Sequence, residues 1–191
     1  SGSRKDFSMQ SFFKILKGNS MRLKYPFDCT FIDYPDNESC AVIIYVMGCE
    51  NSCNGCHNIQ FIDYDYSIGT KEMEVNEIVN ELIIACNRNR TDKIVISGGE
   101  CLSKRNIETT KQILEKMFEK YKISLYTSYG KYYIIENEVK GFTFVKSGLY
   151  DVTLKQESKK TNDYIMFASK NQILYDENLN QLSNEGIYYF N

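Results

Sequence analysis

Three cysteines, Cys49, Cys53 and Cys56, stand close together in a loop rich in Gly and Asn. A disulfide uses two thiols, and a structural zinc site usually uses four ligands. An iron–sulfur cubane has four iron corners that cysteine thiolates can hold. Three cysteines on one short loop therefore predict a cubane whose fourth iron stays open to bind a small molecule.

Two other chemistries remain open for this loop. Zinc could be bound by the three thiols and His57, although the adjacent Cys56 and His57 would have difficulty reaching one tetrahedral ion together. A fourth zinc ligand could instead come from a distant cysteine, namely Cys29, Cys40 or Cys101. A redox-active pair of Cys53 and Cys56 would leave Cys49 without a role.

The remaining cysteines fit a structural role. Cys29, Cys40 and Cys86 fit the pattern of buried thiols that act as small hydrophobic side chains. Cys101 follows directly on a Gly-Gly-Glu segment, and we interpret it as a buried structural residue. The clustered cysteines of the loop do not fit this pattern, because packing alone would not crowd three of them into a polar loop.

Composition places the chain among globular proteins. It has 191 residues and a net charge of −2, which disfavours a binder of nucleic acids or anionic membranes. Seven unevenly spread cysteines and no leading apolar segment disfavour a secreted disulfide scaffold. No run approaches the roughly 18 apolar residues of a membrane span. We therefore expect a cytoplasmic protein.

The chain divides into a short extension and one body. Residues 1–20 read as an N-terminal extension or a cloning remnant, in which Met9–Lys17 is weakly amphipathic and basic, as a short docking helix would be. We expect residues 21–191 to form a single domain.

The body alternates between strand and helix patterns. Continuous apolar runs predict buried strands, and apolar residues at helical spacing predict helices. The expected strands are 41–48, 92–100, 123–130 and 141–150, with edge strands at 171–176 and 185–190; the expected helices are 71–88 and 106–121. Repeated strand–helix units predict an α/β fold with a parallel sheet.

Three polar loops follow directly on expected strands. They are the cysteine loop, the segment Ser97–Glu100 (SGGE) and the segment 126–130 (YTSYG). Because ligands of parallel sheets bind at the carboxyl ends of the strands, we expect the three loops to meet on one rim.

The cysteine spacing, Cys-xxx-Cys-xx-Cys, resembles the defining motif of the radical S-adenosylmethionine (SAM) enzymes. The SGGE segment resembles their Gly-Gly-Glu motif. Within that superfamily the chain is most similar to activating enzymes of glycyl-radical enzymes, especially the activases of anaerobic ribonucleotide reductase. This similarity covers roughly residues 25–176 and is carried by 32–35 (IDYP), 126–130 (YTSYG), 146–151 (KSGLYD) and 169–176 (SKNQILYD). It implies a partial (β/α) barrel whose parallel sheet is open on one side, with an irregular C-terminal tail.

The resemblance also implies which residues bind the cofactors. Cys49, Cys53 and Cys56 would be the metal ligands of a [4Fe-4S] cluster, and the open iron would bind SAM. In the SGGE turn, glycines allow close backbone approach and the carboxylate accepts a hydrogen bond from the SAM ammonium group. The expected SAM-binding residues are Ser97, Gly98, Gly99 and Glu100, His57 against the adenine, Thr127 and Tyr129 at SAM or the substrate entrance, and Asn171 with Gln172 at the adenine or ribose. Each has a simpler alternative as a turn, loop or packing residue.

Four departures from the family pattern affect this interpretation. Asp36 follows Pro35 where a glycine is common, and Cys101 replaces a turn-shaping proline after Glu100. These two changes leave the expected ligands intact. Leu149 and Ile173 replace a proline and an arginine in the tail motifs, which leaves the identity of the partner open.

The implied activity is that of a radical SAM activase. Cleavage of SAM would yield methionine and a 5′-deoxyadenosyl radical, which would take a Cα hydrogen from a glycine of a glycyl-radical enzyme, anaerobic ribonucleotide reductase by resemblance. An electron donor such as flavodoxin or ferredoxin would reduce the cluster. A chain with little room for a cap suits a large substrate that brings its own loop. The alternatives are a small-molecule radical SAM enzyme, such as a compact 7-carboxy-7-deazaguanine synthase, and a non-catalytic zinc or iron–sulfur binding module.

Overall fold

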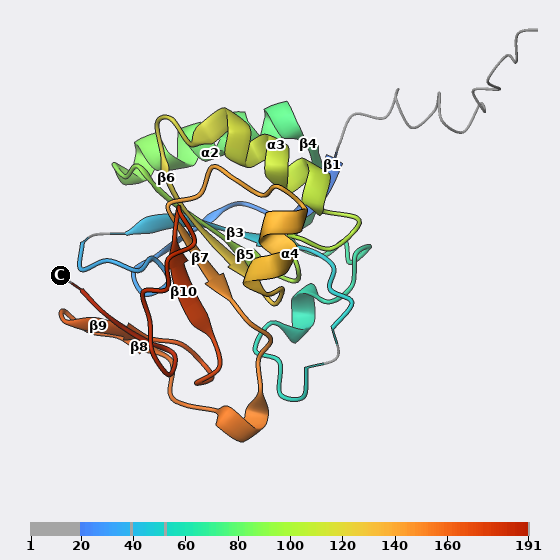
Figure 1. Cartoon of the computed structure of the whole chain (residues 1–191). Coiled ribbons are helices and arrows are strands. Elements are labelled where there is room, and N and C mark those ends of the chain that lie inside the picture. Colours follow the sequence, from blue (N-terminus) through green and yellow to red (C-terminus); the bar gives the residue numbers. More distant parts are fainter. Residues whose placement is uncertain (1–19, 39, 52, 191) are drawn as a thin grey trace, which may run out of the picture.

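A computed structural model describes residues 20–38, 40–51 and 53–190, and its centre is an open sheet (Figure 1). The strand order is β10-β7-β6-β5-β3-β1-β4, and β2 pairs with β3. The four parallel strands are β3 (Ala41–Val46), β5 (Lys93–Gly98), β6 (Lys122–Thr127) and β7 (Phe144–Ser147). The antiparallel pairings add β1 (Ser20–Lys24), β2 (Asp28–Thr30), β4 (Thr70–Glu74) and β10 (Ile173–Asp176). This confirms the predicted α/β fold with a sheet open on one side.

Two helices, α2 (Val75–Asn89) and α3 (Ile107–Met117), cover one face of the sheet (Figure 1). Their apolar stripes pack on alternate residues of the parallel strands and form the main core. Its fully buried members include Val42, Ile44, Ile78, Leu82, Ile94, Ile113, Leu114 and Leu125. A third short helix, α4 (Lys131–Glu136), follows β6. The core fixes the strand ends, and the loops at those ends carry the site.

The opposite face is covered by the loop 31–38 and by a second, three-stranded sheet. That sheet contains β8 (Lys159–Lys160), β9 (Tyr164–Met166) and β11 (Ile187–Tyr189). Side chains from both coverings are buried with those of the main sheet: Tyr34, Ile43 and Val95 in one cluster, and Ile165, Phe167 and Leu174 in another. Much of the expected irregular tail is therefore ordered into a second layer.

The predicted start of the first helix is too early in the chain. The prediction started it at residue 71, but β4 continues to Glu74 and α2 begins at Val75. The residues of β4 pair one for one with β1, from Ser20↔Glu74 to Lys24↔Thr70. This long-range pairing overrides the local helical spacing. Likewise β1, β2, α4, β8 and β9 are short elements without a strong local signal, and the sequence did not predict them.

The predicted extension 1–20, with its possible helix at Met9–Lys17, lies outside the described residues except for Ser20, which begins β1. In the described part of the chain, no helix combines the length and the apolar character needed to cross a membrane.

Candidate functional site

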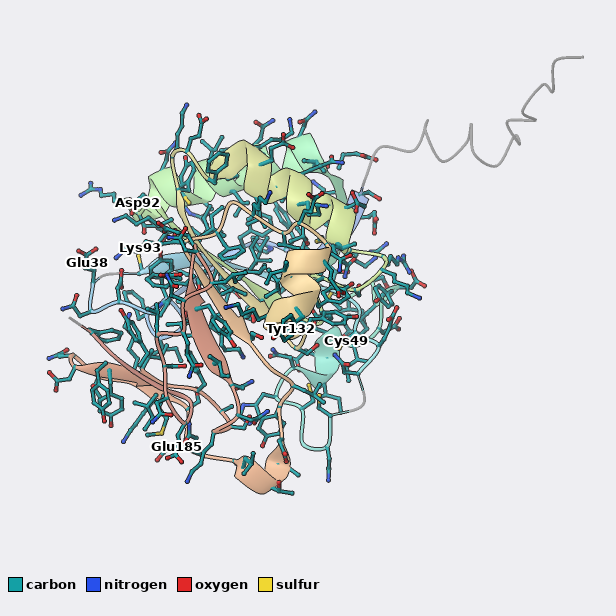
Figure 2. All side chains as sticks on the ribbon, in the orientation of Figure 1. Glu38, Cys49, Asp92, Lys93, Tyr132 and Glu185 are labelled. Carbon is teal, nitrogen blue, oxygen red and sulfur yellow. The ribbon has the colours of Figure 1, made fainter. Side chains whose placement is uncertain are left out.

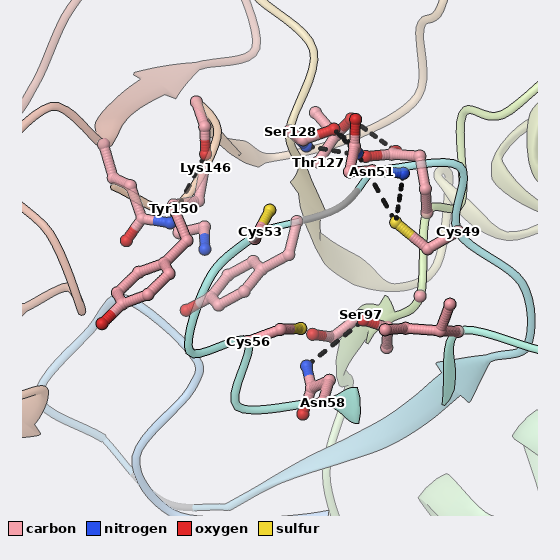
Figure 3. Close-up of a pocket in the computed structure, with 17 residues that line it drawn as sticks. Cys49, Asn51, Cys53, Cys56, Asn58, Ser97, Thr127, Ser128, Lys146 and Tyr150 are labelled. Atoms are coloured by element: carbon pink, nitrogen blue, oxygen red, sulfur yellow. Dashed lines mark hydrogen bonds between the residues drawn. The ribbon is translucent and has the colours of Figure 1, made fainter. Parts of the chain in front are cut away.

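A cavity of about 120 Å³ opens at the carboxyl ends of the parallel strands (Figure 3). The three loops that the sequence placed on one rim all contribute to its wall. Of the expected site residues, it is lined by Cys49, Cys53, Cys56, Ser97, Gly98, Gly99, Glu100, Thr127 and Gln172. The structure therefore brings the cysteines and the Gly-Gly-Glu turn to one place.

The three cysteines are free and half-buried, and their sulfur atoms stand at different sides of the same space (Figure 3). Burial raises the pKa values of the Cys49 and Cys53 thiols. The Asn51 backbone N–H and side-chain Nδ2 lie 3.4 and 3.5 Å from Cys49 Sγ, so both donate to it. Across the described residues, no three His, Cys, Asp or Glu side chains converge on a single metal ion, whereas a cubane takes each cysteine on a different iron corner.

Gly98 and Gly99 let the Gly-Gly-Glu turn pack closely against the cysteine loop and the strand that precedes it. A Cβ on Gly99 would lie 2.3 Å from the carbonyl oxygen of Gly48, and one on Gly98, at φ +112°, would lie 2.5 Å from the backbone nitrogen of Val46. The Glu100 N–H donates to Gly48 O at 2.7 Å. The two loops touch backbone to backbone, and no side chain larger than hydrogen fits between them. This close packing fixes the position of the Gly-Gly-Glu turn relative to the cysteine loop.

Glu100 is buried and its carboxylate accepts four hydrogen bonds. Leu102 N donates to Oε1 at 3.0 Å and the Thr127 hydroxyl at 2.6 Å. Ser128 donates to Oε2 through its backbone N–H at 2.8 Å and through its hydroxyl. These donors fill the roughly four acceptor positions of a carboxylate. Glu100 thus contributes a fixed negative charge to the cavity wall, and Thr127 contacts that charge directly.

Several further residues line the cavity without an expected binding role of their own. They are Asn51, Asn58, Ile62, Tyr126, Ser128, Lys146, Gly148 and Tyr150. Lys146 lies one residue before the end of β7, and its Nζ lies 4.6 Å from the ring centroid of Tyr126. Burial lowers the pKa of Lys146 to about 8, against the opposing effect of Asp33 and Glu100. The available signals were its position near the carboxyl end of an expected strand and its place at the start of the segment 146–151 (KSGLYD).

A second cavity, of about 220 Å³, adjoins the first. Both are lined by Cys56, Asn58, Ser97, Tyr126, Lys146, Tyr150 and Gln172. Its other walls come from the loop 31–38, through Ile32 and Asp33, and from the second sheet and its flanks, through Ile165 and Phe167. The second layer of the fold therefore encloses space beside the cysteine loop.

Three expected SAM-binding residues lie outside the first cavity. His57 lines the second cavity, with its ring centroid 5.6 Å from that of Tyr150. Tyr129 stacks on Tyr133 at 3.9 Å, and Asn171 Nδ2 donates to Leu149 O at 2.7 Å. Their proposed contacts with SAM stay predictions.

An α/β sheet with a cysteine-lined cavity at its carboxyl edge is the arrangement expected of an iron–sulfur protein. The chain belongs to the 4Fe-4S single cluster domain family, whose model matches residues 37–175. This confirms the sequence-based recognition of a radical SAM protein, with a [4Fe-4S] cluster and SAM as its cofactors.

Two similar proteins put this family in context. Over 93 residues the chain is 36% identical to a candidate glycyl-radical enzyme activating enzyme of Methanocaldococcus jannaschii. The match covers 48% of this chain but only 35% of that relative. The crystal structure of QueE from Escherichia coli superposes with a TM-score of 0.44 at 13% identity, covering 64% of this chain and 58% of the other.

Proposed function

We propose that the chain is a radical SAM activase that generates a glycyl radical on a partner enzyme, with anaerobic ribonucleotide reductase as the expected partner. One observation carries the proposal: Cys49, Cys53, Cys56 and the Gly98–Glu100 turn line a single cavity. The name of the Methanocaldococcus jannaschii relative supports the activating role. The domain performing it would comprise residues 21–191.

The donor set fits the cofactors. Cys49, Cys53 and Cys56 would hold a [4Fe-4S] cluster, and the remaining iron would be free for SAM. When bound, the two cofactors supply a 5′-deoxyadenosyl radical after one-electron reduction. An electron donor such as flavodoxin or ferredoxin would deliver that electron.

The chain's own residues would bind and orient the cluster and SAM. Asn51 places two N–H donors on Cys49 Sγ, and hydrogen bonds to cluster sulfurs tune the reduction potential. Gly98 and Gly99 let the turn pack directly against β3 and the cysteine loop, which sets the position of the turn beside the cysteines. The fixed negative charge of Glu100 attracts the SAM ammonium group, while the ammonium of Lys146 on the same wall attracts a carboxylate.

Exposed apolar residues support a protein as the substrate. Ile32, Ile59, Leu149 and Val152 are all exposed, and they belong to the segments that border the two cavities. Exposed apolar side chains gathered around a functional opening are typical of protein-binding surfaces. A partner that brings its own glycine loop would cover them.

The second cavity favours one alternative, a small-molecule radical SAM enzyme. The short chain led us to expect no cap, but the second sheet and the loop 31–38 wall about 220 Å³ beside the cysteines. A small substrate could bind there without a partner protein. This alternative predicts substrate turnover by the chain alone.

The test is anaerobic reconstitution with iron and sulfide, followed by dithionite and SAM. We expect 5′-deoxyadenosine, and we expect a glycyl radical signal in electron paramagnetic resonance only when anaerobic ribonucleotide reductase is present. Cys53→Ala should abolish the nucleoside, and Cys29→Ser should not. Production of 5′-deoxyadenosine without any radical on the reductase would reject the partner. Absence of 5′-deoxyadenosine from cluster-loaded protein would reject the activity itself.

A further inference from the structure

Three more thiols gather at the end of the sheet opposite the cavity. Cys29 lies on β2, Cys40 directly precedes β3, and Cys86 lies on α2. The sequence suggested three separate, buried packing residues. In the structure Cys29 and Cys40 are only half-buried, and both are free thiols.

The register of β2 against β3 places two of these thiols side by side. Cys29 pairs with Val42, and Cys40 is two residues from Val42 on the same strand path. Side chains two residues apart on a strand point to the same face, so Cys29 and Cys40 are diagonal neighbours. Burial and a hydrogen bond with the Cys40 thiol raise the pKa of Cys29 to about 11. The Cys40 thiol also donates to Asn89 O at 3.8 Å.

We propose that Cys29 and Cys40 are a redox pair that forms an intramolecular disulfide with a small disulfide oxidant such as oxidised glutathione. One thiolate attacks the oxidant, releases one reduced glutathione and leaves a mixed disulfide. The other cysteine thiolate then displaces the second glutathione. The two cysteines lose two electrons, the oxidant gains them, and the two thiol protons pass to the released glutathione.

The disulfide would close the segment that walls the second cavity. The chain between the two cysteines carries Ile32 and Asp33 into that cavity. The carbonyl oxygen of Asp33 accepts a hydrogen bond from the Tyr126 hydroxyl, and Tyr126 lines both cavities. Oxidation would therefore tie down one wall of the substrate space. This inference does not depend on the proposed activity, because disulfide formation needs neither SAM nor a partner.

Cys86 provides a matched control. Its side chain is buried in the main core, and burial raises its pKa to about 12. A thiol so protected reacts slowly with a bulky oxidant. The proposed bond therefore excludes Cys86, although it lies in the same region.

The test uses cluster-loaded protein under anaerobic conditions, incubated with oxidised glutathione at about pH 8.5, where more thiolate forms. Remaining thiols are blocked, the protein is unfolded, and it is cleaved after Glu38, the one glutamate between the two cysteines. We expect the two flanking peptides to remain joined until a reductant is added. The intact chain should lose two hydrogen atoms in mass without gaining glutathione.

Single Cys→Ser variants identify which two cysteines form the disulfide. Cys29→Ser and Cys40→Ser should each abolish the link and retain one glutathione on the remaining cysteine, while Cys86→Ser should keep the link. Because the downstream peptide also contains Cys49, loss of the link in Cys40→Ser is required. Amide hydrogen exchange over residues 31–38 should slow on oxidation in the wild type and not in Cys40→Ser. Glutathione adducts on both cysteines without a link, or a link that survives in either single variant, would overturn the proposal.

Discussion

Glu100 is a buried carboxylate whose partners reach it from two different loops. Thr127 and Ser128 follow β6, while Glu100 itself follows β5. The sequence suggested Glu100 as a free acceptor for an ammonium group. In the structure it is not free: four donors of this chain fill its acceptor positions and lock the two strand ends together, so its charge is what remains to attract an ammonium group.

Replacing Glu100 with Gln tests both roles. The amide would place N–H donors against the donors of Ser128 or Leu102, which leaves buried polar groups unpaired. We expect a loss of about 1–3 kcal/mol in the free energy of unfolding, together with weaker SAM binding. Urea unfolding and equilibrium SAM binding measure the two effects. Glu115→Gln, on the exposed side of α3, is the control; equal behaviour of the two variants would contradict this account.

Lys146 gives a prediction that depends on pH. Because burial lowers its pKa to about 8 from an ordinary value near 10.5, the folded state disfavours the charged form. The resulting destabilisation is fully present below pH 8 and is relieved as pH rises toward 10.5. Lys146→Met should therefore be more stable than the wild type by roughly 3 kcal/mol at pH 7. The difference should shrink above pH 8, as followed by urea unfolding at several pH values. A difference that is constant with pH would show that the charge is not its cause.

Some site residues can be predicted from the sequence more readily than others. The cysteines were predictable because their spacing has few structural explanations, and the SGGE segment became predictable only from its place after a strand downstream of the cysteine loop. Lys146 and Ser128 were not, because a single Lys or Ser after a strand is common and gains meaning only from the cavity that it faces. His57, Tyr129 and Asn171 were proposed by resemblance, and the structure places them outside the first cavity.

At the scale of elements, the turn after β5 lies so close to the cysteine loop that only glycine fits at the contact. A Cβ on Gly99 would meet the carbonyl oxygens of Gly48 and Phe61 at 2.3 and 2.7 Å. Gly99→Ala should push the two loops apart and lower SAM cleavage by roughly 100-fold. An assay of 5′-deoxyadenosine formation checks this. Gly130→Ala is the control, because no atom lies within 4 Å of the added Cβ. Near-normal cleavage by Gly99→Ala would show that close packing of the two loops is not needed for SAM cleavage.

The long buried strands and helices were predictable because their periodicity is strong. The short elements were not, because their stability comes from pairing with distant segments. The pairing of β4 with β1 is one example, and the three strands of the second sheet are another.

At the scale of the molecule, ionic contacts hold the loop 31–38 on the side away from Cys49, Cys53 and Cys56 (Figure 2). The buried Lys93 Nζ lies 2.5 Å from Asp36 Oδ2 and 2.6 Å from Glu38 Oε2. Figure 2 shows Lys93 and Glu38 together, far from Cys49. This contact holds one end of the loop whose other residues wall the second cavity.

Lys93→Met should release that loop. Its partners are more exposed and can be hydrated, so we expect a loss of about 1–2 kcal/mol in the free energy of unfolding, less than for a fully buried pair. Amide hydrogen exchange over 31–38 should become faster. Lys122→Met breaks an exposed pair with Asp92 at 3.6 Å and should change stability by less than about 0.5 kcal/mol. If the two variants behave alike, the proposed role of Lys93 in holding the loop 31–38 is wrong.

The central claim is that three cysteines hold a [4Fe-4S] cluster and leave one iron open for SAM. Electron paramagnetic resonance of the reduced, reconstituted protein, with and without SAM, tests it most directly. We predict a [4Fe-4S] signal that changes on SAM addition, is lost in Cys53→Ala and is kept in Cys29→Ser. Zinc in place of iron, or a cluster signal that SAM leaves unchanged, would contradict the claim.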